Sequence, residues 1–234
     1  MRRPYWIPPN APSDDFPPIE RSMSQPDGLL AIGGDLSPGR ILAAYRRGIF
    51  PWYSDDQPIL WWSPNPRMVL FPENLKVSRS LGKNIRNGDF TVTVDKAFQA
   101  VLAQCAIMPR KNQHGTWITR EMQAAYTQLH MRGFAHSIEC WQDGQLVGGL
   151  YGIAIGRVFF GESMFSRSSN ASKVAFVKFV QQIEVWGYEL IDCQVYSEHL
   201  ATLGACKISR QEFKQLLDYC DLPGKPLPWP KELV

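Results

Sequence analysis

The chain has 234 residues, a formal net charge of +3 and 44% hydrophobic residues, a composition typical of a soluble globular protein and not of a disordered one. No apolar run reaches the roughly 20 residues of a membrane span, and prolines follow the charged N-terminus, so we expect no membrane helix and no secretory signal. The five cysteines form no C-x-x-C pair, and the four histidines lack metal-ligand spacing. These patterns favour reduced thiols in a cytosol and count against zinc or disulfides.

The first part of the chain is rich in prolines. Residues 1–28 contain seven of them, which predicts an extended arm without regular elements. A short apolar strand over 29–32 follows. The next helix is expected to begin at Pro38, with Ser37 as its N-cap.

Aromatic residues gather in two segments, 49–53 and 59–62. These segments fit either a plain core or a stacking platform for a nucleotide base. The composition changes at 64–66, where two prolines flank an asparagine. We therefore expect a small N-terminal α+β domain with a proline-rich arm over 1–66 and a second domain over 67–234.

Basic residues dominate the start of the second domain. Between residues 76 and 120 the chain has eight Lys or Arg and two acids. A helix capped by Ser78 and reaching about Asn87 would carry its basic side chains on one face, namely Arg79, Lys83 and Arg86. This face fits either a solvated surface or a nucleic-acid contact, and the sequence leaves both open.

The rest of the chain has a regular order of elements. We first expect a strand over 90–94, a helix capped by Asp95, a basic loop over 110–115 and a helix to about 132. Three strands should follow at hairpin spacing, over 135–141, 146–155 and 158–162. The last elements expected are a helix over 171–186 capped by Asn170, a strand over 190–195, a helix from Ser209 and an irregular tail over 223–230. This order is that of the GNAT acyltransferase fold. The fold class expected is α+β, with a GNAT-like domain after a small N-terminal domain.

Two strands contain polar side chains in apolar surroundings. Asp192 and Gln194 are two residues apart on the strand over 190–195, so they should share one face. Glu162 interrupts a second apolar strand, the one that comes before the helix over 171–186. Such groups are costly to bury unless they are hydrogen-bonded or used. Both interpretations remain open here: satisfied polar groups of a core, or two polar strands that share a cleft.

Seven segments occur together in order: GGDLSP (33–38), Tyr45 with GIFPW (48–52), WWSP (61–64), GTWIT (115–119), GESMFS (161–166), NASK (170–173) and LIDCQ (190–194). Over residues 28–206 the chain thus resembles the bacterial leucyl/phenylalanyl-tRNA–protein transferase family. The resemblance implies a cytoplasmic enzyme that moves leucine, phenylalanine or, more weakly, methionine from aminoacyl-tRNA to proteins with N-terminal Arg or Lys. It also implies that the acceptor becomes marked for proteolysis, and that neither a metal nor CoA is needed.

The resemblance suggests roles for the polar residues. Aminolysis of an activated ester requires placement, a deprotonated amine and help for the oxyanion. Gln194 would orient the amine, and Asp192 would polarise Gln194 or receive the proton through it, so the two are assigned jointly as catalytic. Glu162 would hold the cationic N-terminal residue of the acceptor.

Further residues would bind the aminoacyl-tRNA. The apolar candidates for the aminoacyl pocket are Leu150, Phe159, Val174 and Phe176. Each of them could equally be an ordinary core residue. By matching position, Trp52 and Trp117 would contact the 3′-terminal adenosine. The basic face of Arg79, Lys83 and Arg86 would contact tRNA phosphates.

Two other functions are considered. A CoA-dependent N-acyltransferase of the GNAT type needs glycines before its long helix, and the segment over 167–172 has neither of them. A non-catalytic tRNA-binding module would have a basic face without polar residues in buried strands. Asp192, Gln194 and Glu162 count against it.

Overall fold

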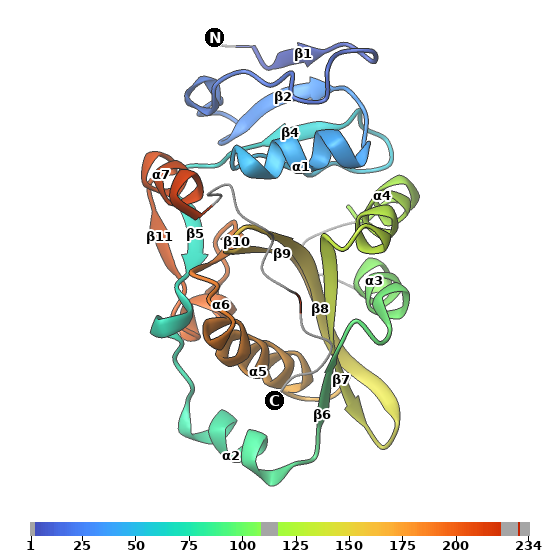
Figure 1. Cartoon of the computed structure of the whole chain (residues 1–234), viewed down its shortest axis with the longest axis vertical. Coiled ribbons are helices and arrows are strands. Elements are labelled where there is room, and N and C mark those ends of the chain that lie inside the picture. Colours follow the sequence, from blue (N-terminus) through green and yellow to red (C-terminus); the bar gives the residue numbers. More distant parts are fainter. Residues whose placement is uncertain (1–2, 109–116, 221–228, 230–234) are drawn as a thin grey trace.

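The computed structural model describes residues 3–108, 117–220 and 229. The described residues form two β-sheets, one of four strands and one of seven. Figure 1 shows the smaller sheet near the N-terminus and the larger one in the remaining chain. The expected basic loop over 110–115 lies outside the described residues, as does the tail over 223–230 apart from Trp229. No helix in the described part of the chain is long and apolar enough to cross a membrane.

The N-terminal sheet has the strand order β1-β2-β4-β3, formed by β1 (Tyr5–Ile7), β2 (Leu29–Gly33), β4 (Leu60–Trp62) and β3 (Phe50–Pro51). The prediction that residues 1–28 contain no regular element is wrong. Residues Tyr5–Ile7 are free of proline and pair in parallel with β2, and a 3-10 helix, η1, covers Ile19–Arg21. Helix α1 (Pro38–Arg46) begins as expected, because Ser37 Oγ accepts a hydrogen bond from the Arg40 N–H.

The larger sheet has the order β11-β5-β10-β9-β8-β7-β6. Its strands are β5 (Arg67–Leu70), β6 (Thr91–Val94), β7 (Ala135–Gln142), β8 (Gln145–Ile155), β9 (Val158–Ser166), β10 (Leu190–Gln194) and β11 (Cys206–Ile208). β9 and β10 run parallel, and the other neighbours are antiparallel. β5 and β11 were not expected, because strands of four and three residues are too short to show alternation.

Helices cover both faces of this sheet (Figure 1). They are α2 (Arg79–Asn87), α3 (Phe98–Ile107), α4 (Arg120–Met131), α5 (Ala171–Val185), α6 (Glu198–Thr202) and α7 (Arg210–Cys220), with a 3-10 helix η2 at Pro72–Asn74. The sheet separates two cores, and successive residues of a strand enter opposite ones. Tyr151 and Phe160 join the core under α3 and α4, whereas Leu150 and Phe159 join the core under α5. Leu150 and Phe159 therefore lie on the α5 face.

Two of the expected helix caps differ from the observed ones. Asp95 does not cap α3: its carboxylate accepts the N–H of Ser137 and lies 2.7 Å from His136 Nδ1. Glu139 accepts the N–H groups of Lys96 and Ala97 instead, since α3 begins later than expected, at Phe98. Asn170 occupies the N-cap of α5 with a φ of +65°, but its side chain accepts no capping hydrogen bond.

The element order confirms the expected fold class. From β6 onward the order is a strand, two helices, three antiparallel strands, a helix and a strand parallel to the third. The short helix α6, the edge strand β11 and helix α7 complete the domain. The chain is an α+β protein with a GNAT-like domain after a small N-terminal sheet. The chain passes from one sheet to the other between Trp62 and Arg67. We propose the domain boundary in this segment, at residue 66.

Candidate active site

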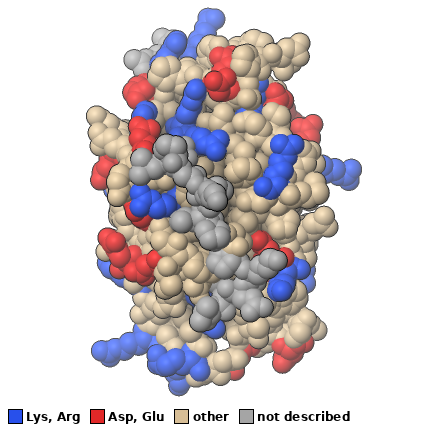
Figure 2. Space-filling view, in the orientation of Figure 1, with Lys and Arg blue, Asp and Glu red and all other residues tan. Residues whose placement is uncertain are grey.

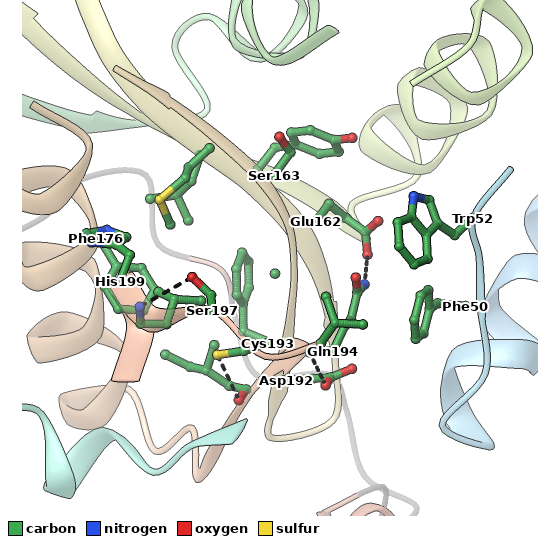
Figure 3. Close-up of a pocket in the computed structure, with 18 of the residues that line it drawn as sticks. Phe50, Trp52, Glu162, Ser163, Phe176, Asp192, Cys193, Gln194, Ser197 and His199 are labelled. Atoms are coloured by element: carbon green, nitrogen blue, oxygen red, sulfur yellow. Dashed lines mark hydrogen bonds between the residues drawn. The ribbon is translucent and has the colours of Figure 1, made fainter. Parts of the chain in front are cut away.

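A cavity of about 550 Å³ lies where the N-terminal sheet faces β9 and β10. Residues Phe50, Pro51 and Trp52 line it from the N-terminal side, and the segment from Ile191 to Ser197 lines it from β10. Figure 3 shows Phe50 and Trp52 opposite the side chains of Glu162 and Gln194. The two polar strands predicted from the sequence thus share one cavity.

Asp192 forms a buried ion pair with Arg67 on the adjacent strand β5. The Nε and Nη2 atoms of Arg67 lie 2.8 Å and 2.6 Å from the two carboxylate oxygens, and both residues have an exposed fraction of 0%. A bidentate pair with this geometry fixes the position of the Asp192 side chain. Its oxygens accept from the guanidinium and from the backbone N–H of Gln194, whereas the side-chain amide of Gln194 donates to Glu162.

Gln194 lies at an irregularity of β10. The register with β5 shifts between Asp192 and Gln194, and Gln194 has a φ of +62°. Alternation along the strand predicted that Asp192 and Gln194 share one face, and both residues line the same cavity despite this bulge. The Gln194 N–H donates to Asp192 Oδ1 at 2.9 Å, and its Nε2 donates to Glu162 Oε1 at 3.0 Å.

Glu162 is buried among neutral hydrogen-bond donors. The hydroxyls of Tyr45 and Tyr126 donate to its two oxygens at 2.6 Å and 2.8 Å, and Gln194 supplies the third donor. Burial raises the pKa of Glu162 to about 7, against the effect of these three donors and with a further contribution from the charge of Asp192. Burial also raises the pKa of both tyrosines well above the ordinary value, and the charge of Glu162 adds to this effect.

The apolar part of the cavity contains most of the predicted aminoacyl-pocket residues. Leu150, Phe159 and Phe176 line it, together with Met164 and Ile191, which the sequence did not single out. Val174 does not belong to this lining: it is 1% exposed and packs in the core under α5. Residues two apart on a helix point roughly 200° apart, so Val174 and Phe176 face different directions.

The structure brings both predicted tryptophans to the cavity. Trp52 follows β3, Trp117 precedes α4, and both line the cavity. Trp62 fixes the backbone here, since its Nε1 donates to the Trp52 carbonyl at 2.7 Å. The two predicted indoles therefore border the same space as Glu162 and Gln194.

The predicted phosphate-contacting helix lies away from the cavity. Arg79, Lys83 and Arg86 are exposed on α2, whereas Leu81 is buried. α2 lies at the end of the molecule opposite the N-terminal sheet (Figure 1). Figure 2 shows Lys and Arg side chains at the lower left of that end, with Asp and Glu side chains at its lower right.

The sequence analysis did not predict that three residues contact the acids of the site, namely Arg67, Tyr45 and Tyr126. Arg67 directly precedes an apolar run, Met68 to Leu70, and a charge at the edge of a buried strand was the available signal. Tyr45 belongs to a segment that carries the family resemblance, but its partner Glu162 lies 117 residues away. Tyr126 is one of several apolar-face residues of α4, with no local signal.

The cavity combines an apolar pocket, two aromatic side chains and a carboxylate that lacks an ion-pair partner in the described part of the chain. Such a site suits a ligand with an apolar group, a planar ring and a cation. Across the described ranges, no cluster of His, Cys, Asp and Glu side chains could hold a metal.

The start of α5 does not suit the pyrophosphate of CoA. Ser172 N–H donates to Ser166 Oγ at 3.2 Å, and Ala171 N–H donates to the Ser168 carbonyl at 3.1 Å. Because these amides already have protein partners, they are not directed at a ligand, as a CoA-dependent acyltransferase requires.

Comparison with known proteins gives consistent matches. Residues 69–218 match the family model described as leucyl/phenylalanyl-tRNA protein transferase, and residues 34–65 match the model of its N-terminal domain. The chain is 61% identical to the leucyl/phenylalanyl-tRNA–protein transferase of Nitrosospira multiformis over 86% of this chain and 87% of that protein. It is 53% identical to that of Hydrogenovibrio crunogenus over 100% of this chain and 91% of that protein.

Similarity to solved structures is weaker. A conserved protein of unknown function from Bacteroides thetaiotaomicron gives a TM-score of 0.45 at 15% identity, covering 70% of this chain and 56% of that one. A GCN5-related N-acetyltransferase from Kribbella flavida gives a TM-score of 0.36 at 14% identity, covering 74% of this chain and 61% of that one.

Proposed function

The chain belongs to the leucyl/phenylalanyl-tRNA–protein transferase family, and from this premise we propose which substrates its aminoacyltransferase activity uses. The donors are leucyl-, phenylalanyl- and, less well, methionyl-tRNA. The acceptors are proteins with an N-terminal Arg or Lys, which the added residue marks for degradation by the N-end rule. The enzyme works in the cytoplasm, where charged tRNA is available.

The proposed reaction is aminolysis of an ester. The α-amino nitrogen forms a bond to the aminoacyl carbon, the ester bond to the ribose oxygen breaks, one proton leaves the amine and one ends on that ribose oxygen. A free α-amino group has a pKa of about 7.7–8.0, so it must lose a proton near neutral pH before it attacks. We assign Asp192 and Gln194 jointly to this step, with the Gln194 amide oxygen accepting from the amine because its Nε2 donates to Glu162.

The observation that carries the acceptor proposal is the environment of Glu162. Its carboxylate lines the cavity and, in the described part of the chain, receives only hydroxyl and amide donors. An N-terminal Arg or Lys side chain would supply the missing cation through a charge-assisted hydrogen bond. Asp192 offers no such opening, because Arg67 already occupies both of its oxygens.

The remaining lining residues suit the aminoacyl-tRNA end. Leu150, Phe159 and Phe176 form an apolar surface for an unbranched or γ-branched side chain. Trp52 and Trp117 border the same cavity and are proposed to contact the 3′-terminal adenosine by stacking. Arg79, Lys83 and Arg86 are proposed to contact tRNA phosphates at the far end of the molecule.

The decisive experiment incubates the protein with leucyl-tRNA and a peptide that begins with Arg. Mass spectrometry should detect a peptide extended by one leucine at its N-terminus. The same peptide with an acetylated N-terminus is the control, because it keeps the Arg side chain but has no amine to attack. Absence of a leucine-extended product from the free peptide, or equal extension of the acetylated one, would refute the proposed function.

A further inference from the structure

Arg67 is buried at the point where three separate parts of the chain meet. Its Nε and Nη2 donate to Asp192 on β10, and its Nη1 donates to the Gly48 carbonyl at 3.1 Å. The rings of Phe50 and Phe213 lie over its guanidinium, with centroids 4.7 Å and 4.6 Å away. Arg67 thus joins β10, the start of β3 and helix α7 through one side chain.

We propose that Arg67 and Asp192 form a neutral positioning unit that sets the backbone of Gln194, and that Asp192 takes up no proton during the reaction. This inference rests on the proposed function and divides the roles that it assigned jointly. Gln194 touches the amine, whereas Asp192 acts only through Gln194.

The hydrogen bonds of Asp192 argue against proton uptake there. Its carboxylate accepts from three N–H groups, two of Arg67 and one of Gln194. A proton on either oxygen would break part of the bidentate pair and leave the Arg67 charge buried without compensation. Asp192 is therefore the least suitable proton acceptor in the cavity, although it is the acid nearest to Gln194 in sequence.

The backbone of Gln194 shows what the pair does instead. A φ of +62° is uncommon for a residue other than glycine, and this conformation turns the Gln194 N–H toward Asp192 Oδ1. The same turn places the Gln194 carboxamide against Glu162 on the neighbouring strand β9. Without the Asp192 acceptor, the backbone would relax to the extended conformation and the carboxamide would leave its place.

The other side of Arg67 contacts the wall of the cavity that faces Gln194. Phe50, Pro51 and Trp52 line the cavity opposite Gln194, and Arg67 holds the chain immediately before them through the Gly48 carbonyl. Gly48 has a φ of +73°, and a Cβ added there would lie 3.0 Å from the Phe213 ring. This wall also pairs with β4, and Trp62 Nε1 donates to the Trp52 carbonyl, so the wall keeps these supports when the Arg67 bond to Gly48 is lost.

A double-mutant cycle tests the inference with Arg67→Met, Asp192→Asn and the double variant. Each single change leaves one partner without its complement. The double variant removes both charges of the pair, and the introduced asparagine still offers an oxygen to the Gln194 N–H. We expect kcat to fall by about 100-fold in each single variant, the effect of a small misplacement of reacting groups. The double variant should recover to within about tenfold of wild type, since coupled residues are not additive.

The matched control is the same pair of changes at another Arg–carboxylate pair, Arg157→Met with Glu189→Gln. These residues form an ion pair that lies outside the cavity, with side chains 28% and 37% exposed. Neither the single changes nor the double change should alter kcat. Loss of kcat there would mean that general destabilisation, and not the position of Gln194, lowers the rate.

The outcomes separate this inference from the proposed function. If wild type forms no leucine-extended peptide, the proposed function fails. Thermal melting of wild type, the two single variants and the double variant still reports whether Arg67 and Asp192 are coupled. If wild type is active and the double variant is as slow as Asp192→Asn, Asp192 itself is needed for proton transfer and the inference is overturned. Should a single variant fail to fold, the double variant decides alone: a kcat at least about 100-fold below wild type overturns it.

Discussion

Two buried carboxylates border the same cavity from neighbouring strands, and their surroundings are opposite. Asp192 on β10 faces a guanidinium at 2.6 Å and 2.8 Å. Glu162 on β9 receives two tyrosine hydroxyls and one amide, all neutral. Burial is nearly the same, with exposed fractions of 0% and 9%, so the neighbouring charge and not the depth distinguishes them.

This difference shows how one cavity can use two acids for different purposes. A carboxylate with a buried counter-charge is fixed in position and closed to further cations. A carboxylate with neutral donors keeps its hydrogen bonds, but burial raises its pKa, here to about 7 for Glu162. Such a group remains open to a cationic ligand and sensitive to pH near neutrality.

Removing the counter-charge should produce the largest effect. Arg67→Met leaves the Asp192 carboxylate buried without a partner, and we expect the free energy of unfolding to fall by about 3–5 kcal/mol in urea titrations at pH 7. The control is Lys214→Met, which breaks an exposed pair with Asp218 at 2.6 Å and should cost less than about 1 kcal/mol. A loss below about 1 kcal/mol for Arg67→Met would show that Asp192 does not depend on this cation.

The raised pKa of Glu162 predicts a pH-dependent stability. Its pKa is about 7 in the folded chain and 4.5 for the ordinary group, so between these values the folded state binds more protons than the unfolded state. Stability therefore falls as pH rises from 4.5 to 7, by up to about 3 kcal/mol, since one pKa unit is worth about 1.4 kcal/mol. Glu162→Gln lacks this titration, so the free energy of unfolding of the variant minus that of wild type should increase from pH 5 to pH 8. A constant difference across that range would contradict the assignment.

The charge of Glu162 should also decide acceptor choice. Citrulline is a neutral isostere of arginine, so the ratio of kcat/KM for Arg-starting and citrulline-starting peptides cancels the titration of the α-amino group. In wild type this ratio should rise by roughly tenfold or more as pH passes through 7, because hydrogen bonds between charged groups are worth about 1.5–3 kcal/mol. In Glu162→Gln the ratio should stay low and independent of pH. A pH-independent ratio in wild type would place the acceptor cation elsewhere.

The apolar part of the cavity should respond without involving either carboxylate. Leu150→Ala widens the pocket, so kcat/KM for tryptophanyl-tRNA should rise relative to leucyl-tRNA by about tenfold, consistent with about 1–3 kcal/mol per methylene. Val174→Ala is the control, since Val174 is buried on α5 but does not line the cavity. The Arg and Lys acceptor preference should not change in either variant. If Leu150→Ala only lowers thermal stability, Leu150 is ordinary core.

Exposed charges should show the smallest effect for each residue. A triple alanine change of Arg79, Lys83 and Arg86 should weaken binding of all elongator tRNAs alike and reduce the salt dependence by up to about three phosphate contacts. Binding can be followed by fluorescence at several salt concentrations. An unchanged slope would mean that α2 presents a solvated face and contacts no phosphates.

Local patterns in the sequence were sufficient for most of the fold. Alternation and turn residues predicted the hairpins of β7, β8 and β9, and Ser37 and Ser78 cap their helices as expected. The same patterns failed where an element was only a few residues long, as in β5 and β11. They also failed for Asp95, because its hydrogen-bond partners come from β7 and not from the helix that follows it.

The sequence by itself determined that Asp192, Gln194 and Glu162 would be buried polar residues in apolar strands, because hydrophobic periodicity is a local property. Only the tertiary structure decided what each of them contacts. Arg67 reaches Asp192 across 125 residues of sequence, and Tyr45 reaches Glu162 across 117. The partners of a buried charge depend on strand order and register, which the packing of the whole sheet sets. The division into one neutralised acid and one open acid therefore arises only when β5 lies beside β10 and α1 brings its tyrosine to β9.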